Sequence, residues 1–436
     1  MLSRKWGGPA GRREDRSHPD EERGSTPGAG RLMVLRAAAM FDGVSPALLA
    51  RPSVVIADGV ITAVYGPAGP LPGDAQVVDL PGLTLMPGLV DAHLHLCFDA
   101  SGDPVGRLAE TGDELLREQM AAAARRALRA GITTVRDLGD RGYLAVDLRD
   151  QRRAGTAGRL PAIVAAGPPI TTPGGHCHFL GGAASGDGGL RGAVQERAER
   201  GVDAIKVMAS GGNLTPGSLA HQPQFSAQAL RVIVREAHRH GLPVIAHAHS
   251  ARSITDAVAA GVDGIEHATF MTASGVGAPE ELIRVIAARR IAVGWTVGRD
   301  PDQAGPVMPQ IASRMVAMTG TRRRLHESGA VIVAGSDAGV SLAKPHDVLP
   351  YAVGDLAAAG LSPAEILQAM TSKAATACGL GNHKGRIAPG YDADIIAVDG
   401  NPLDDPTVIR RLRAVYAGGR AVRPPLGTSQ ARIEVS

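Results

Sequence analysis

The sequence predicts an α/β protein, a (β/α)₈ TIM barrel accompanied by a small β-sandwich domain built from both chain ends. Three observations lead to this fold class. The 436 residues exceed one ordinary domain but suit a barrel of about 250 residues plus a smaller module. Through the middle of the chain, strand-like apolar runs alternate with helix-like Ala/Arg/Glu-rich stretches, the pattern of repeated βα units. Both ends are instead rich in short β-type runs.

The composition points to a globular protein that handles a small molecule. Hydrophobic residues make up 44% and charged residues 20%, which suits a soluble chain with a large core. The 46 basic and 43 acidic residues leave a net charge of +3, so no long-range field selects nucleic acid or an anionic membrane. Cys97, Cys177 and Cys378 lie far apart, which argues against a disulfide framework and a cysteine zinc site. We therefore expect a small-molecule substrate and a location in the reducing cytoplasm.

The β-rich ends are expected to form one composite domain. Near the start, SVVIADGVITAVYG at Ser53–Gly66 contains the hairpin signal Asp58-Gly59. Near the end, ADIIAVDG and LRAVYAGGRAV supply short apolar strands around glycine turns. The polar, Gly/Pro-rich start has no signal-peptide core and is expected to be a disordered leader or a mis-assigned start. The predicted divisions are a leader at 1–30, a β-sandwich domain at 31–86 plus 384–424, a barrel at 87–383, and a tail at 425–436.

Eight strands can be counted in the barrel region. Their sequences are GLVDAHLH, TTVRDL, AIVAAG, AIKVMAS, PVIAHAH, GIEHA, AVGWT and VIVAGSD. Helices are predicted between them, including Glu114–Ala130, Ala227–His240 and Pro363–Ala377. Eight parallel strands with intervening helices indicate a closed barrel.

Polar residues gather where these apolar strands end. In a (β/α)₈ barrel the carboxyl ends of the strands carry the catalytic groups. Here five strands deliver ionisable or metal-type side chains at or near that end: His93 and His95, Lys206, His247 and His249, His267, and Asp337. The strand ends are therefore the predicted active site.

The spacing of His93 and His95 favours a shared metal ion. Residues two apart on a strand point to the same face, so both imidazoles can reach one ion while Leu94 points away. The pair His238 and His240 falls late in a helical pattern, where a step of two residues turns about 200° and separates the side chains.

Three further residues each have two interpretations. Lys206 places an ammonium inside an apolar strand, which is costly without compensation, unless it points to the helix layer and reaches water. Asp337 either binds metal and accepts a proton or caps the next helix. His176 lies in the loop TTPGGHCHFLGG, where contact with substrate and no role at all are equally compatible with the pattern.

Together these motifs resemble the amidohydrolase superfamily, especially its imidazolonepropionase-like and prolidase-like (Xaa-dipeptidase) branch. The resemblance extends from about residue 31 to residue 422 and covers nearly the whole chain. It is carried by MPGLVDAHLHL, AIKVMASGG, VIAHAHS, GIEHATF and AGSDAG, which occur in the order typical of the superfamily.

The resemblance implies a site for two divalent metal ions, with zinc as the first expectation. One ion would be held by His93, His95 and Asp337. The second would be held by His247 and His267. Lys206, carbamylated by carbon dioxide, would bridge both, which would turn a buried cation into an anionic ligand.

The resemblance also implies a mechanism and substrate contacts. The metals would activate water and polarise the substrate carbonyl, and Asp337 would accept the water's proton and return it to the leaving nitrogen. His249 and His176 would contact the substrate, although Cys177 stands where related segments usually have glycine. Arg136 would bind a substrate carboxylate or, equally, pair with Asp137 or another acid at the rim.

Several functions remain open at this point. The first is hydrolysis of an amide-type C–N bond in an N-acyl amino acid, dipeptide or cyclic amide. The second is an imidazolonepropionase-like lactam hydrolase, and the third is a non-catalytic scaffold with this fold. Deamination is disfavoured because Lys206 suggests a bridged metal pair. A homo-oligomer is usual in the superfamily, but no part of the sequence locates an interface.

Overall fold

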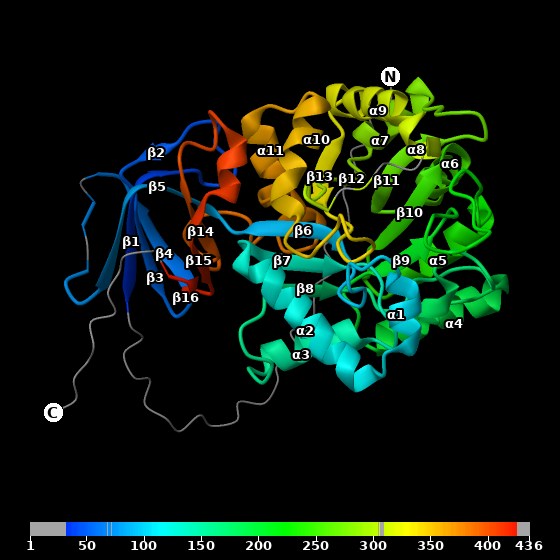
Figure 1. Cartoon of the computed structure of the whole chain (residues 1–436), viewed down its shortest axis with the longest axis horizontal. Helices are drawn as coiled ribbons and strands as arrows, with labels where there is room; N and C mark the ends of the chain where they lie inside the picture. The colour runs from blue at the N-terminus through cyan, green and yellow to red at the C-terminus, as the bar shows by residue number, and fades with distance from the viewer. Residues whose placement is uncertain (1–31, 68, 71, 304, 306–308, 425–436) are drawn as a thin grey trace, which may run out of the picture.

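The computed structural model describes residues 32–424 except 68, 71, 304 and 306–308. A sheet built from the two chain ends lies beside a larger part in which parallel strands alternate with helices (Figure 1). The predicted leader at 1–30 and tail at 425–436 lie outside the described residues. No described helix has both the length and the apolar character needed to cross a membrane.

The chain ends form a single eight-stranded sheet in the order β16-β15-β14-β5-β1-β3-β4, with β2 paired to β1. Its strands are β1 Met33–Met40, β2 Leu49–Ala50, β3 Ser53–Ala57, β4 Val60–Tyr65, β5 Gln76–Pro87, β14 Ile395–Asp399, β15 Leu412–Ala417 and β16 Arg420–Arg423. The antiparallel pairing of β14 with β5 joins the two ends of the chain. The predicted hairpin is confirmed: Asp58 and Gly59 turn between β3 and β4 with φ of 48° and 82°, the two positive values of a type I′ turn.

All eight runs predicted for the larger part contain strands. These are β6 Leu89–Leu94, β7 Ile132–Asp137, β8 Ala162–Ala165, β9 Ile205–Met208, β10 Val244–Ser250, β11 Gly264–Met271, β12 Ala292–Thr296 and β13 Val331–Gly335. They pair in parallel as two sheets, β13-β12-β11-β10-β9 and β6-β7-β8. Isolated parallel bridges, Leu94 with Ala338 and Ile170 with Val207, link segments of the two sheets. The fold is α/β and TIM-barrel-like.

Helices cover the strands. They are α1 Pro104–Glu110, α2 Asp113–Arg129, α3 Leu144–Arg153, α4 Gly186–Glu199, α5 Ala227–Arg239, α6 Ala251–Ala260, α7 Glu280–Ala288, α8 Pro309–Ala312, α9 Met315–Glu327, α10 Val353–Ala358, α11 Pro363–Ala369 and α12 Ser372–Ala377. Helix α2 packs on β7, α3 on β8, α6 on β10 and β11, and α12 on β6 and β13. The predictions for α2 and α5 are confirmed to within one residue.

The predicted helix at Pro363–Ala377 is wrong as a single element. It divides into α11 and α12 because Thr371 leaves the helical region, with φ of −135° and ψ of −96°. The Met370 carbonyl accepts a hydrogen bond from the Val90 backbone at 2.8 Å. This contact with β6 depends on tertiary packing, so helical periodicity alone does not reveal the break.

Candidate metal centre

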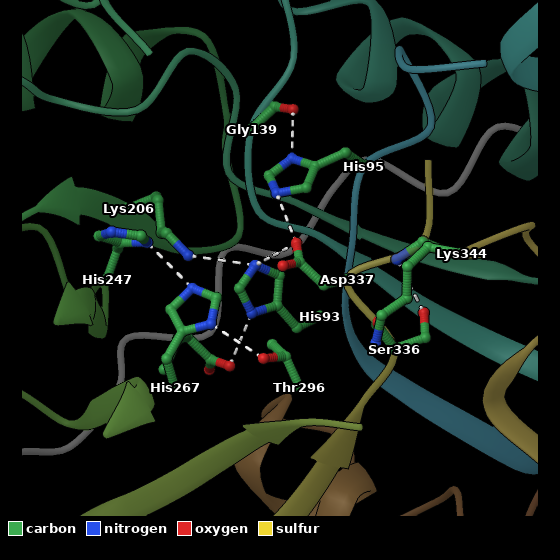
Figure 2. Close-up of polar contacts among 12 residues, drawn as sticks. His93, His95, Gly139, Lys206, His247, His267, Thr296, Ser336, Asp337 and Lys344 are labelled. Atoms are coloured by element: carbon green, nitrogen blue, oxygen red, sulfur yellow. Dashed lines mark hydrogen bonds and ion pairs between the residues drawn. The ribbon is translucent and has the colours of Figure 1, made fainter. Parts of the chain in front are cut away.

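Side chains from five strands or strand ends meet at one place. Two sets of three residues have ligating atoms within 4.8 Å of one another: His93, His95 and Asp337, and His247, His249 and His267. Figure 2 shows His93 between Asp337 and Lys206, with His267 and His247 nearby. The structure therefore brings together all six residues predicted as metal ligands.

The first set has the geometry of a metal site. The Nδ1 atoms of His93 and His95 lie 2.8 Å from a Glu266 carboxylate oxygen and 2.9 Å from the Gly139 carbonyl. Both partners only accept hydrogen bonds, so each Nδ1 carries the proton and each Nε2 keeps its lone pair. These Nε2 atoms face the same Asp337 oxygen at 3.6 and 3.5 Å. Two imidazole lone pairs and a carboxylate oxygen that face one another in a buried site repel unless a cation lies among them. These three residues therefore fit a metal ion.

The second set is arranged in a similar way. His247 Nδ1 lies 2.9 Å from His267 Nε2, while His247 Nε2 donates to the Gly211 carbonyl at 3.0 Å. The other nitrogen of His267 lies 2.9 Å from the Thr296 hydroxyl. One nitrogen of each ring is therefore fixed by a hydrogen bond, and the other two nitrogens, His247 Nδ1 and His267 Nε2, face each other. Two ligands of one tetrahedral zinc ion lie about 3.4 Å apart, so a small adjustment would admit an ion.

Lys206 lies between the two sets. Its side chain is buried, and its Nζ is 3.4 Å from His93 Nε2. Among the described residues, no carboxylate forms an ion pair with this amine. Burial lowers the pKa of Lys206 to about 8, while Glu266 and Asp337 act in the opposite direction. The alternative that Lys206 reaches water through the helix layer is therefore wrong, and a substantial fraction of the amine is neutral near pH 8.

The electrostatics leave the other ligands ready for a cation. Burial lowers the pKa of His93 to about 4, and it lowers those of His247 and His267 well below the usual range. Burial alone would raise the pKa of Asp337, but contacts with His95 and His93 hold it well below its usual range. The centre thus offers neutral imidazoles and one carboxylate, the protonation states in which these groups bind metal.

Backbone strain is concentrated at the same place. His267 and Asp337 adopt left-handed conformations, with φ of 68° and 57°. Such conformations cost non-glycine residues about 1–3 kcal/mol each and are typical of functional sites. Near them, Gly335 makes room for His93, because a Cβ at position 335 would lie 2.5 Å from the His93 Cβ. The N-cap alternative for Asp337 is wrong, because no described helix begins there.

The centre opens into a larger pocket. A cavity of about 230 Å³ is lined by both sets of residues together with Lys206, His176 and Cys177. A second cavity of about 540 Å³ shares His249, His267 and Asp337 with the first. The candidate metal centre therefore adjoins a space large enough for a small organic molecule.

Comparison with known proteins identifies the family. Residues 84–422 match the model of the amidohydrolase family. The chain belongs to the amidohydrolase family. The resemblance seen in the motifs is thus confirmed. The family places the chain among hydrolases of amide-type C–N bonds, and the two sets of His and Asp side chains agree with its general dependence on metal.

Three proteins illustrate the similarity. Ochratoxinase of Aspergillus niger is 27% identical over 379 residues, covering 78% of this chain and 76% of that protein. Imidazolonepropionase of Deinococcus deserti is 25% identical over 390 residues, covering 81% and 86%. The crystal structure of a Xaa-Pro dipeptidase with methionine bound in its active site has a TM-score of 0.79 and 27% identity, covering 90% of this chain and 100% of that one.

The two histidines predicted to contact substrate both face the cavity of this amidohydrolase. His249 lines both cavities, and its Nδ1 lies 2.9 Å from the Thr269 hydroxyl. The His176 ring centroid lies 4.8 Å from that of His247, and its Nδ1 has no hydrogen-bond partner within the described part of the chain. Cys177 has φ of 56°, a left-handed conformation that glycine adopts more readily than cysteine.

The expectation that Arg136 binds a substrate carboxylate is wrong. Its buried guanidinium donates to the Ala92 carbonyl at 2.7 Å, the Ala377 carbonyl at 2.9 Å and the Glu266 carboxylate at 3.0 Å. With its three nitrogens engaged, Arg136 holds Glu266 instead of substrate. The alternative prediction, an ion pair of Arg136 with an acid, is correct in kind. The acid, however, is Glu266 of β11, whereas Asp137 or another acid at the rim was predicted.

Glu266, which the sequence patterns did not single out, positions the candidate metal ligand His93 in this amidohydrolase. Its buried carboxylate binds both His93 and Arg136. Burial alone would raise the pKa of Glu266, but the contacts with His93 and the charge of Arg136 hold it at about 2. Gly294 makes this possible, because a side chain at position 294 would overlap the Glu266 carboxylate. The available signal was a carboxylate inside the apolar strand GIEHATF, next to His267.

We expect Glu266→Gln to weaken metal binding about 10- to 100-fold, the usual effect of removing the carboxylate that orients a ligating histidine. The amide would still fill the space but could not stabilise the His93 Nδ1 proton as strongly. Titration of zinc against a competing chelator measures the effect. Glu281→Gln, at an exposed position of α7, is the matched control. An unchanged zinc affinity for Glu266→Gln would contradict this role.

Proposed function

We propose that this amidohydrolase uses two divalent metal ions, zinc first among them, to cleave N-acyl amino acids or dipeptides. His93, His95 and Asp337 would hold one ion, and His247 and His267 the other. Carbamylated Lys206 would bridge the pair. When bound, the ions would supply an activated water and polarise the substrate carbonyl.

The position of Lys206 is the observation that carries the proposal. Its buried amine lies 3.4 Å from His93 Nε2 and in the same cavity as both sets of ligands. A permanent cation there would repel metal ions. A neutral amine can attack carbon dioxide and lose a proton, forming an N–C bond and an anionic carbamate. That anion would supply the negative charge that two neighbouring ions need.

The remaining site residues have separate roles in this proposal. Asp337 accepts a proton from water and delivers it to the departing nitrogen, so one carboxylate serves first as base and then as acid. His249 binds the substrate's carbonyl or carboxylate from the boundary between the two cavities. His176 has an unpartnered nitrogen for the same purpose.

Similarity to a Xaa-Pro dipeptidase and to ochratoxinase supports a peptide or N-acyl amino acid as substrate. Similarity to an imidazolonepropionase supports the second candidate, opening of a lactam ring. Because the structure brings together all six candidate ligands, the non-catalytic scaffold is the weaker alternative. We further propose a closed barrel at 87–383, a separate β-sandwich domain at 31–86 and 384–424, and a cytoplasmic homo-oligomer.

Product analysis after incubation with zinc and bicarbonate tests the proposed function. The panel contains N-acetyl amino acids, Xaa-Pro and other dipeptides, and cyclic amides. Cleavage of a linear amide yields two smaller products, whereas ring opening yields one product with the mass of water added. Cleavage of acyclic members would support the main proposal. Turnover of cyclic amides alone would support the lactam alternative, and release of ammonia from a carbon skeleton left intact would contradict both.

A further inference from the structure

The larger cavity contains cations that the proposed chemistry does not use. Beyond the residues shared with the metal centre, its wall includes Arg322 on α9 and Lys344 in the segment after β13. Figure 2 shows Lys344 beside Ser336, close to Asp337. Neither cation is among the predicted metal ligands or substrate contacts.

The guanidinium of Arg322 has no polar partner among the described residues. Its central carbon lies 5.7 Å from the centroid of the Trp295 ring, and no hydrogen bond or ion pair joins Arg322 to any described residue. Burial lowers the pKa of Arg322, and the charge of Asp355 opposes this shift. A partly buried guanidinium offers five donors in a planar fork, and leaving them unpaired is costly. The side chain is therefore available for an anion that enters the cavity.

Lys344 supplies a second basic group near the reacting groups. Burial lowers the pKa of Lys344 to about 8, while the charges of Asp337 and Asp355 act in the opposite direction, so the amine is mostly protonated at pH 7. Its Nζ donates to the Ser336 carbonyl at 2.8 Å, which uses one of the three hydrogens of the ammonium. Its charge is one of the influences that lower the pKa of Asp337. An anion bound by Lys344 would thus lie near the bond that is cleaved.

The rest of the wall indicates what kind of anion fits. Met271, Val297, Met318 and Val340 provide apolar surface around the cations. The charged lining residues are three cations, Arg299, Arg322 and Lys344, and two carboxylates, Asp337 and Asp355, which sum to +1. This excess favours an anion, and the apolar wall favours one that is attached to an apolar body. Arginine can bind a carboxylate through two parallel hydrogen bonds.

We propose that Arg322 and Lys344 bind a carboxylate of the substrate, making the chain selective for amides in which a carboxylate lies close to the scissile C–N bond. N-acyl amino acids and dipeptides are such compounds, whereas their C-terminal amides and uncharged lactams are not. This inference rests on the proposed function and narrows its substrate class. The apolar wall then takes the side chain of the amino acid or the acyl group.

Paired ligands test this selectivity without requiring turnover. N-acetyl-L-leucine and N-acetyl-L-leucinamide differ only in the terminal carboxylate. We expect the zinc-loaded chain to bind the acid about 10- to 100-fold more tightly than the amide in calorimetric titrations, a ratio typical of a partly buried charge pair. Arg322→Met and Lys344→Met should each reduce this preference by about 10-fold or more. Arg322→Lys should restore part of it.

Arg323→Met, an exposed neighbour on α9, is the matched control and should keep the wild-type ratio. Thermal melts establish that each variant is folded, and any variant that is not folded is replaced by the corresponding Gln substitution. Loss of the preference for the acid in the Arg322 and Lys344 variants supports the inference. This holds even if neither ligand is hydrolysed, because a lack of hydrolysis would count only against the proposed function. Equal binding of acid and amide by the unaltered chain, or an unchanged ratio in both variants, overturns it.

Discussion

Replacing Lys206 with alanine should reduce hydrolysis at least about 1000-fold, equivalent to about 4 kcal/mol of transition-state stabilisation. The change removes the group proposed to bridge the ions and leaves a gap between His93 and the second set of ligands. Metal content should fall from about two ions per chain to one or fewer. Metal analysis and kcat/KM for an N-acyl amino acid or dipeptide provide the two measurements.

A loss of general folding would produce a similar result, so the experiment needs a control. Lys373→Ala changes a partly buried lysine on α12, away from both sets of ligands, and should retain metal and activity. Circular dichroism melts should show that both variants are folded. Retention of two ions and normal hydrolysis by Lys206→Ala would refute the bridging role of this lysine.

Asp337→Asn should lower kcat by about 100- to 10,000-fold, the range contributed by a positioned acid–base group. The amide occupies nearly the same volume but cannot accept the proton of water. It also removes the charge that faces His93 and His95 at 3.6 and 3.5 Å, so binding at the first site should weaken as well. Activity measured at saturating zinc separates the catalytic loss from the loss of metal.

Asp187→Asn, at an exposed position of α4, is the corresponding control. If Asp337→Asn regained full activity once enough zinc was added, this carboxylate would be a ligand only and another group would carry the proton. The left-handed backbone at Asp337 makes Asn a suitable replacement, because asparagine tolerates this conformation better than most residues do.

The sequence indicated which candidate ligands would lie together, because their positions follow from local patterns. Apolar runs locate the strands, and histidines two apart on one strand must share a face, as His93 and His95 do. The parallel arrangement then places the ends of β6, β9, β10, β11 and β13 together. Strand periodicity and the general architecture of alternating βα units are therefore enough to place these side chains.

Features that depend on packing between distant segments could not be predicted in this way. The position of Arg136 near the end of TTVRDL suggested contact with substrate. Its guanidinium instead donates a hydrogen bond to Glu266, which is 130 residues away in the sequence. The break between α11 and α12 involves a contact with β6. Likewise, the contact of Arg322 with Trp295, and the lack of a polar partner for its guanidinium in the part of the chain that the structure describes, become evident only once α9 is placed. No local pattern in a single sequence records these pairings.

A crystal structure of zinc-loaded protein grown with bicarbonate, with anomalous scattering recorded at the zinc edge, tests the binuclear centre most directly. We expect two anomalous peaks, one among His93, His95 and Asp337 and one beside His247 and His267. Density for a carbamate should extend from Lys206 toward both. A single peak with an unmodified Lys206 amine, or no peak among these residues, would contradict the binuclear centre.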